Sequence, residues 1–156
     1  MPKRLLLSIA LIFATAALPL HAFADTVFQA DLSGTLNVPP CMSSATGKVT
    51  FVLNKAQTEV FYIIEINNPS GGREIATLIQ NAPPGQNGPV FKLLPLGLMK
   101  DGVWNVTPFQ VNELTNGRVY VAFYTIGYPA GELRGNLGEP PSPTENSSWS
   151  AVKSLF

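Results

Sequence analysis

The sequence contains very little histidine and cysteine. Its 156 residues include one of each, His21 and Cys41. An ordinary zinc or copper site draws several ligands from these two residue types, and a disulfide needs two cysteines. The composition therefore argues against a conventional metal site and excludes a disulfide within one chain.

Charge is also scarce. Charged residues make up 13% of the chain, against about 25% in a typical soluble protein. The 10 basic and 10 acidic residues give a formal net charge of zero. A nucleic-acid-binding protein is expected to carry a basic stripe or patch, so no nucleic-acid partner is predicted.

The first 24 residues have the pattern of a secretory signal peptide. Lys3 and Arg4 precede an apolar run at 5–18, and small residues flank Phe23 just before Asp25. The run is shorter than the roughly 20 residues of a membrane-spanning helix. We therefore predict cleavage after Ala24, export to the periplasm or the extracellular space, and no stable membrane insertion afterwards. The mature chain has no histidine, so it cannot form a Ser-His-Asp triad.

The rest of the chain divides into a predicted β domain at 25–138 and a flexible C-terminal tail at 139–156. Short β-rich runs separated by Gly and Pro indicate an all-β fold. In the first run Phe28, Ala30 and Leu32 alternate with polar residues and are expected to face inward. The predicted strands cover 27–36, 48–54, 59–67, 74–79, 90–94, 118–126 and 132–137.

One short helix is predicted at 108–114. Thr107 and Gln110 form a capping box, and Pro108 suits the first helical position. The tail is polar and Pro-rich up to Ser150, apart from Trp149, and it ends in an apolar tip. It is either a frayed end or a docking segment or sorting signal. The apolar residues of the tip are Trp149, Val152, Leu155 and Phe156.

Several segments carry a family resemblance. They are 28–34, Val38-Pro39-Pro40, Ala45-Thr46-Gly47, Asn87-Gly88-Pro89-Val90 and 128–135. In this order and spacing the chain resembles the chordin-type (CHRD) domain over 27–137. The resemblance implies an immunoglobulin-like antiparallel β-sandwich in an exported protein, without a well-established catalytic activity. The most specific part is Tyr-Pro-Ala-Gly-Glu-Leu-Arg-Gly, with the signature residues Pro129, Gly131, Glu132, Arg134 and Gly135.

The chain departs from the family at its histidines. Members commonly carry His-x-His ahead of the Asn-Gly-Pro segment and His-Thr ahead of the Pro-Ala-Gly-Glu turn. At these positions the chain has Thr77, Ile79 and Tyr124. The resemblance thus implies that the candidate metal site of the family is degenerate here, and that no metal or cofactor is bound. The three residues form either a closed part of the core or a repurposed pocket.

Our first hypothesis is a non-enzymatic, exported binding module for a protein or surface partner. It would bind through loops 69–73 and 82–89 or through the C-terminal tip. The alternative is a copper-type metal-binding protein that uses ligands other than histidine. A third hypothesis, an enzyme using carboxylates alone, requires several acidic side chains to converge in one cleft. The candidates are Glu65, Glu74, Glu113 and Glu132.

Two further residue groups leave alternatives open. Glu132 and Arg134 lie two residues apart, so they are expected to share a strand face. They form an ion pair with each other or with cross-strand partners such as Arg73 or Glu74, or they serve an active site. Cys41 is either sequestered or available for an intermolecular disulfide.

Overall fold

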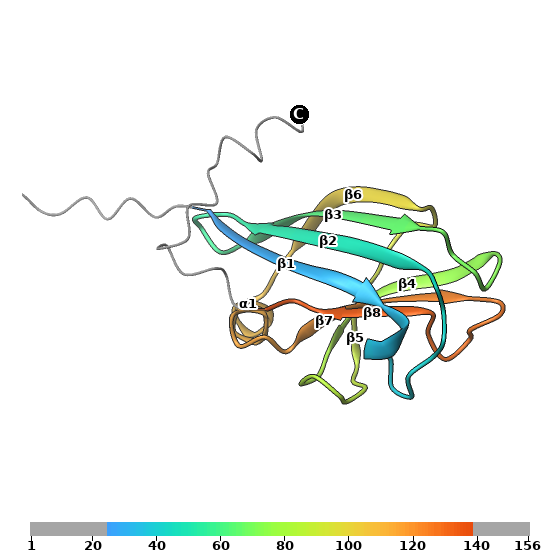
Figure 1. Ribbon diagram of the computed structural model, residues 1–156. Helices are drawn as coiled ribbons and strands as arrows, with labels where there is room; N and C mark the ends of the chain where they lie inside the picture. Colours follow the sequence, from blue (N-terminus) through green and yellow to red (C-terminus); the bar gives the residue numbers. More distant parts are fainter. Residues whose placement is uncertain (1–24, 139–156) are drawn as a thin grey trace, which may run out of the picture.

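A computed structural model describes residues 25–138 (Figure 1). The predicted signal peptide (1–24) and tail (139–156) lie outside the described residues, so both stay predictions. The described chain forms eight strands, a short 3₁₀ turn (Gly34–Leu36) and one α-helix. The elements are β1 (Thr26–Ser33), β2 (Thr46–Leu53), β3 (Glu59–Asn67), β4 (Glu74–Asn81), β5 (Val90–Leu93), β6 (Met99–Asn105), α1 (Pro108–Thr115), β7 (Val119–Thr125) and β8 (Leu133–Asn136).

All eight strands belong to one antiparallel sheet, in the order β5-β4-β7-β8-β1-β2-β3-β6. The sheet curls so that β1, β2, β3 and β6 lie over β4, β5, β7 and β8 (Figure 1). The two halves join where β8 meets β1, in one registered pair between Ser33 and Arg134. The all-β prediction is confirmed. The immunoglobulin-like arrangement stays a prediction, because the strands form one curled sheet.

The core fills the space between the two halves. The predicted inward residues Phe28, Leu32, Val49, Phe51 and Leu53 are buried, and Ala30 is half-buried. Period-2 alternation places such residues on one face of each strand, and curling the sheet brings the apolar faces together. Buried residues from the opposite half complete the core: Ile79, Val121, Phe123 and Leu133.

The predicted helix is present as α1. The Thr107 hydroxyl accepts a hydrogen bond from the Gln110 amide at 3.3 Å, and the Gln110 side chain accepts one from the Thr107 amide at 2.9 Å. This capping box satisfies two amide groups that lack partners within the helix. Val111 and Leu114 are buried against the core. Within residues 25–138, no helix has the length and apolar character needed to cross a membrane.

β6 is a strand that the sequence patterns did not reveal. Its inward positions are Lys100, Gly102 and Trp104, whereas the apolar Met99 and Val103 face outward. A charged residue and a glycine therefore occupy positions where alternation would require apolar side chains. A Cβ atom on Gly102 would lie 2.6 Å from the Tyr62 hydroxyl oxygen, so a larger residue there would require the buried Tyr62 side chain to shift.

β1 is shorter than predicted and ends at Ser33 rather than Leu36. The chain turns at Gly34, whose carbonyl accepts hydrogen bonds from the amides of Asn37 (3.2 Å) and Cys41 (3.0 Å). A Cβ atom on Gly34 would lie 2.8 Å from the Cys41 carbonyl oxygen. The turn therefore depends on a glycine at this position.

Candidate functional site

Thr77 and Ile79 lie on the inner face of β4. Neither side chain is exposed, and Ile79 belongs to the main core. The Thr77 hydroxyl donates a hydrogen bond to Glu74 Oε1 at 2.6 Å. These two positions are therefore part of the closed interior.

Tyr124 lies on the opposite face of the same half-sheet. It pairs with Ala76, whereas Thr77 pairs with the core residue Phe123. Because successive residues of a strand point to opposite faces, the structure does not bring Tyr124 together with Thr77 and Ile79. That these are the replaced histidine positions stays a prediction.

The positions on β4 that share the face of Tyr124 are its partner Ala76 and, further along the strand, Leu78 and Gln80. The Tyr124 hydroxyl donates to Gln80 Oε1 at 2.8 Å. Burial and the nearby Tyr120 raise the pKa of Tyr124, against opposing effects of Arg134 and the Gln80 hydrogen bond. Leu78, Gln80 and Tyr124 therefore share the outer face. Leu78 and Gln80 each follow by one residue the positions Thr77 and Ile79 that the family resemblance indicated.

Arg134 organises this outer face. Its guanidinium carbon lies 3.7 Å from the centroid of the Tyr120 ring, a cation–π geometry. Its nitrogens donate to Asn87 Oδ1 and Asn136 Oδ1, both at 3.2 Å. The Tyr120 hydroxyl accepts from the Gly88 amide at 3.1 Å. These contacts fasten the 82–89 loop to the sheet, and Arg134 is only 1% exposed.

Glu132 has a different environment from Arg134. Its Oε1 accepts hydrogen bonds from the hydroxyls of Ser43 (2.8 Å) and Ser70 (3.0 Å) and from the amides of Ser70 and Gly71. Its Oε2 accepts from the Thr125 hydroxyl at 2.7 Å. The ion pairs found within residues 25–138 are Lys100–Glu74 and Arg118–Glu113. The expected ion pair of Glu132 with Arg134 or Arg73 is therefore not formed.

These donors set the protonation of Glu132. Burial raises the pKa of its carboxyl, but the hydrogen bonds from Thr125, Ser43 and Ser70 favour the ionised form more strongly. The pKa of Glu132 is consequently held below its ordinary value. The carboxylate ties the 70–71 loop and the Ser43 segment to the end of β7.

The glycines of the signature stretch are explained by close approaches. Gly131 has φ +120°, and a Cβ atom there would lie 2.9 Å from Asn37 Oδ1. A Cβ atom on Gly135 would lie 2.6 Å from the Asp31 carbonyl oxygen. Glycine at these two positions allows the 128–131 turn and β8 to pack against the first part of the chain.

Cys41 is a free, half-buried thiol. Its Sγ accepts a hydrogen bond from Asn37 Nδ2 at 3.3 Å and donates one to the Glu132 carbonyl at 3.2 Å. These contacts favour the sequestered alternative. An intermolecular disulfide stays a prediction.

The four candidate carboxylates lie in different surroundings. Glu65 is exposed on β3, Glu74 pairs with Lys100, Glu113 pairs with Arg118, and Glu132 is held by hydroxyls and amides. Among residues 25–138, no three His, Cys, Asp or Glu side chains gather into a potential metal site.

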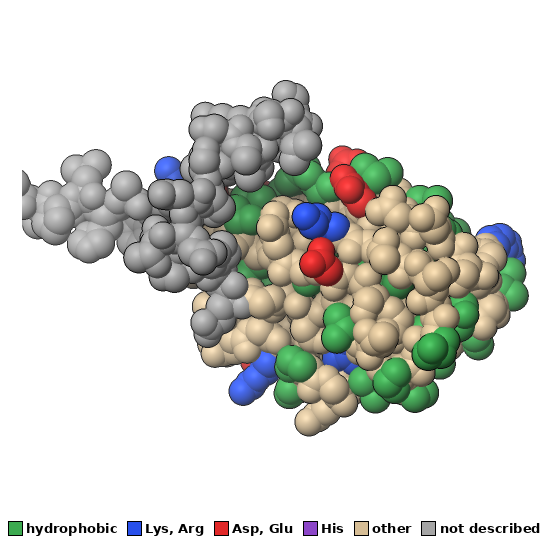
Figure 2. All heavy atoms as spheres, in the orientation of Figure 1, with side chains coloured by type: hydrophobic (Ala, Val, Ile, Leu, Met, Phe, Trp, Pro, Cys, Tyr) green, Lys and Arg blue, Asp and Glu red, His purple; other side chains and the backbone are tan. Residues whose placement is uncertain are grey.

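The connection from β5 to β6 exposes several apolar side chains. Four side chains of the 93–99 segment are between 46% and 65% exposed, whereas Leu94 between them is buried at 3%. Figure 2 shows few charged side chains on this face of the molecule, with hydrophobic side chains along both its upper and lower edges. No pattern in the sequence indicated this segment. Its exposed residues are Leu93, Leu96, Leu98 and Met99.

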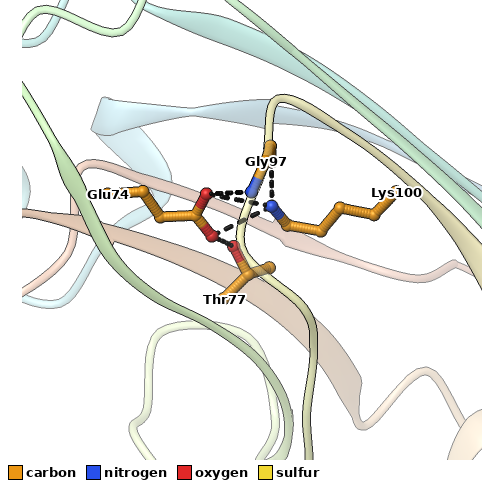
Figure 3. A network of polar contacts seen from close by, with 4 residues as sticks. All are labelled: Glu74, Thr77, Gly97 and Lys100. Atoms are coloured by element: carbon orange, nitrogen blue, oxygen red, sulfur yellow. Dashed lines mark hydrogen bonds and ion pairs between the residues drawn. The ribbon is translucent and has the colours of Figure 1, made fainter.

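A buried ion pair holds this segment in place (Figure 3). Lys100 Nζ lies 2.9 Å from Glu74 Oε1, and the two side chains are 1% and 8% exposed. Glu74 Oε2 accepts a hydrogen bond from the Gly97 amide at 2.7 Å, and Lys100 donates to the Gly97 carbonyl. The ammonium also lies 5.8 Å from the centroid of the Phe123 ring. These contacts anchor the turn that carries the exposed leucines.

Backbone hydrogen bonds hold both ends of the segment. The Leu94 amide donates to the Thr77 carbonyl at 2.9 Å, and the Leu98 carbonyl accepts from the Ile66 amide at 2.8 Å. The segment thus bridges the end of β3 and the middle of β4, which belong to different halves of the curled sheet.

Comparison with known proteins identifies the domain. No curated protein matches the chain, and no solved structure matches it. The CHRD domain matches residues 28–137, which is more than half of the chain and includes all strands except the first residues of β1. On this match, the chain belongs to the CHRD domain family.

Proposed function

We propose that this protein is exported and acts by binding a partner protein through the 93–99 segment. The observation that carries the proposal is the exposure of Leu93, Leu96, Leu98 and Met99 on a turn fixed by Glu74 and Lys100. Contiguous exposed apolar side chains on a soluble domain are typical of an interaction site. Rigidity helps binding, because less conformational entropy is lost when the partner docks.

The buried ionisable groups support the same interpretation. Glu132, Arg134 and the Glu74–Lys100 pair each have protein partners that fix loops to the sheet. Each of these groups therefore has a structural role. The fold thus positions the 93–99 segment, and the interaction takes place at this exposed apolar surface.

Site-specific cross-linking in the exporting cell tests the proposal. A photoreactive phenylalanine analogue replaces Leu96 in the full chain, and a matched variant carries it at Met42, which is 95% exposed. We expect a discrete protein adduct from position 96 that is lost when Leu93 and Leu98 are changed to Ser. The same adduct from both positions, or no adduct from position 96, would contradict the proposal.

Metal analysis distinguishes the alternative function. The purified mature protein is dialysed without chelator and measured by native mass spectrometry, which preserves non-covalently bound metal. Copper or zinc at one equivalent per chain would overturn a purely binding role. We expect the mass of the metal-free chain.

A further inference from the structure

A row of apolar side chains crosses the outer face of the half-sheet formed by β1, β2, β3 and β6. The strand register aligns Val27 with Val52, Val52 with Phe61, and Phe61 with Val103. We call these four residues the apolar row. They lie on the face opposite the core residues Phe28, Phe51, Val60 and Trp104.

The rest of this face is more polar. Four residues further along β1, the register aligns Asp31 with Lys48 and Lys48 with Glu65, a line of alternating charge that ends at Met99 on β6. Within the apolar row, Val103 is 53% exposed, and the other three side chains are partly buried. The apolar character is thus concentrated at the end of the face where β1 begins.

The described chain leaves the domain toward this same end. β8 runs antiparallel to β1, with Arg134 opposite Ser33. Moving from Arg134 to Gly138 therefore carries the chain back toward Thr26, beside Val27. Neighbouring strands are about 4.8 Å apart, so the row spans roughly 14 Å across its four strands.

The length and chemistry of the remaining chain fit this surface. Residues 139–148 are polar or proline, and they are followed by Trp149, Val152, Leu155 and Phe156. A ten-residue spacer with random-coil dimensions would have a root-mean-square span of about 17 Å and a maximum reach of about 33 Å. The apolar tip can therefore reach any part of the row, and burying it there removes Trp and Phe from water.

We propose that residues 149–156 dock on the apolar row of the same chain. The row supplies aliphatic side chains and one aromatic ring, which suit the indole of Trp149. The 93–99 segment reaches this face only through Met99, four residues from Val103 on β6, so this docking does not depend on the proposed function. The tail would then cover one apolar surface while leaving the other accessible.

Fluorine NMR of the mature chain with 5-fluorotryptophan tests this proposal. The protein has two tryptophans, Trp104 and Trp149, and a Trp149→Phe variant assigns their signals. The buried Trp104 signal reports that the fold is intact. We expect the Trp149 signal of the unmodified chain to lie away from that of free fluorotryptophan and to be unaffected by dilution.

Val103→Lys and Met99→Lys form a matched pair of variants. Both residues lie on the outer face of β6, 53% and 65% exposed, but only Val103 belongs to the apolar row. Val103→Lys should move the Trp149 signal most of the way to the free position, and Met99→Lys should leave it unchanged. A Trp149 signal at the free position in the unmodified chain, or one that Val103→Lys does not move, would overturn the proposal. A signal that changes on dilution would also overturn it, because the occupant would then be a second copy.

Discussion

At the scale of single residues, the signature stretch owes its form to packing and hydrogen bonding. Glu132 is fully buried, yet five hydrogen bonds from three segments of the chain compensate its charge. A buried carboxylate without such donors would be protonated instead. The residue therefore acts as a fastener for the loops around it.

The Glu132→Gln variant should be less stable at neutral pH by about 1–3 kcal/mol. In Gln, an amide nitrogen that can only donate replaces one of the two carboxylate oxygens that accept hydrogen bonds. The pKa of Glu132 is lowered on folding, so its stabilisation is complete above the unfolded pKa of about 4.3. It is lost as pH falls through the lower folded value. Urea unfolding at several pH values measures how the free energy of unfolding of each protein depends on pH.

The exposed Glu59→Gln variant is the control for this series. It should unfold like the unmodified protein at every pH. A destabilisation of the Glu132→Gln variant that stays constant down to pH 3 would show that its charge is not what the surrounding donors stabilise.

Sequence reasoning at the residue scale succeeded for side chains that follow alternation or a local motif. The capping residues Thr107 and Gln110 and the inward Phe28 are examples. It failed for Glu132 and Arg134, because their partners Ser43, Ser70 and Asn87 are distant in sequence. Hydroxyl and amide partners also carry no charge pattern that would identify them.

At the scale of elements, the connection between β5 and β6 was the least predictable part of the fold. Strand β6 carries a charged residue, Lys100, on its inner face. Lys100 forms a buried ion pair there with Glu74 of β4. Neither residue alone indicates an interior ion pair, since lone charges usually lie at the surface. The position of the exposed 93–99 segment depends on this ion pair. The segment could therefore not be predicted from the sequence either.

Replacing Lys100 with Met should destabilise the protein by about 3–5 kcal/mol, because Glu74 would remain buried without its cation. The matched variant is Arg118→Met. Arg118 pairs with Glu113 at 3.5 Å, but its side chain is 52% exposed. Such a pair contributes at most about 1 kcal/mol. Denaturant unfolding of both variants gives the comparison, and equal losses would contradict the structural role of Lys100.

Hydrogen exchange adds a local measure to the same comparison. The Gly97 amide donates to Glu74 in the unmodified protein. Its exchange should accelerate in the Lys100→Met variant well beyond the change expected from global stability. Unchanged relative protection would show that the 93–99 segment is held by its other contacts.

At the scale of the whole molecule, the curled sheet carries apolar surface outside as well as inside. One region is the 93–99 segment, which links β5 to β6, and the other is the apolar row on the outer face of β1, β2, β3 and β6. The CHRD match covers residues 28–137, which include the 93–99 segment and all of the apolar row except Val27, but it assigns no activity to either surface. The functional hypotheses therefore rest on this chain's own exposed residues.

Export makes a prediction about the intact chain. Expression of the full sequence in a secreting host should yield a product whose first residue is Asp25. Mass spectrometry of the intact protein measures this directly, and an Ala24→Lys variant should retain its leader because it removes the small residue at the predicted cleavage position. A product that keeps residues 1–24 in the unmodified chain would contradict the predicted signal peptide.

The most direct test of the central claim is the affinity of the cross-linked partner, once purified, for defined variants of the mature chain. Isothermal titration would compare the unmodified protein with Leu96→Ser and with Met42→Ser, which alters an equally apolar exposed residue elsewhere. Because Leu96 would be buried against the partner in the complex, its replacement by Ser should weaken binding by at least about 10-fold. Met42→Ser should have no effect. Equal affinities for all three proteins would contradict binding through the 93–99 segment.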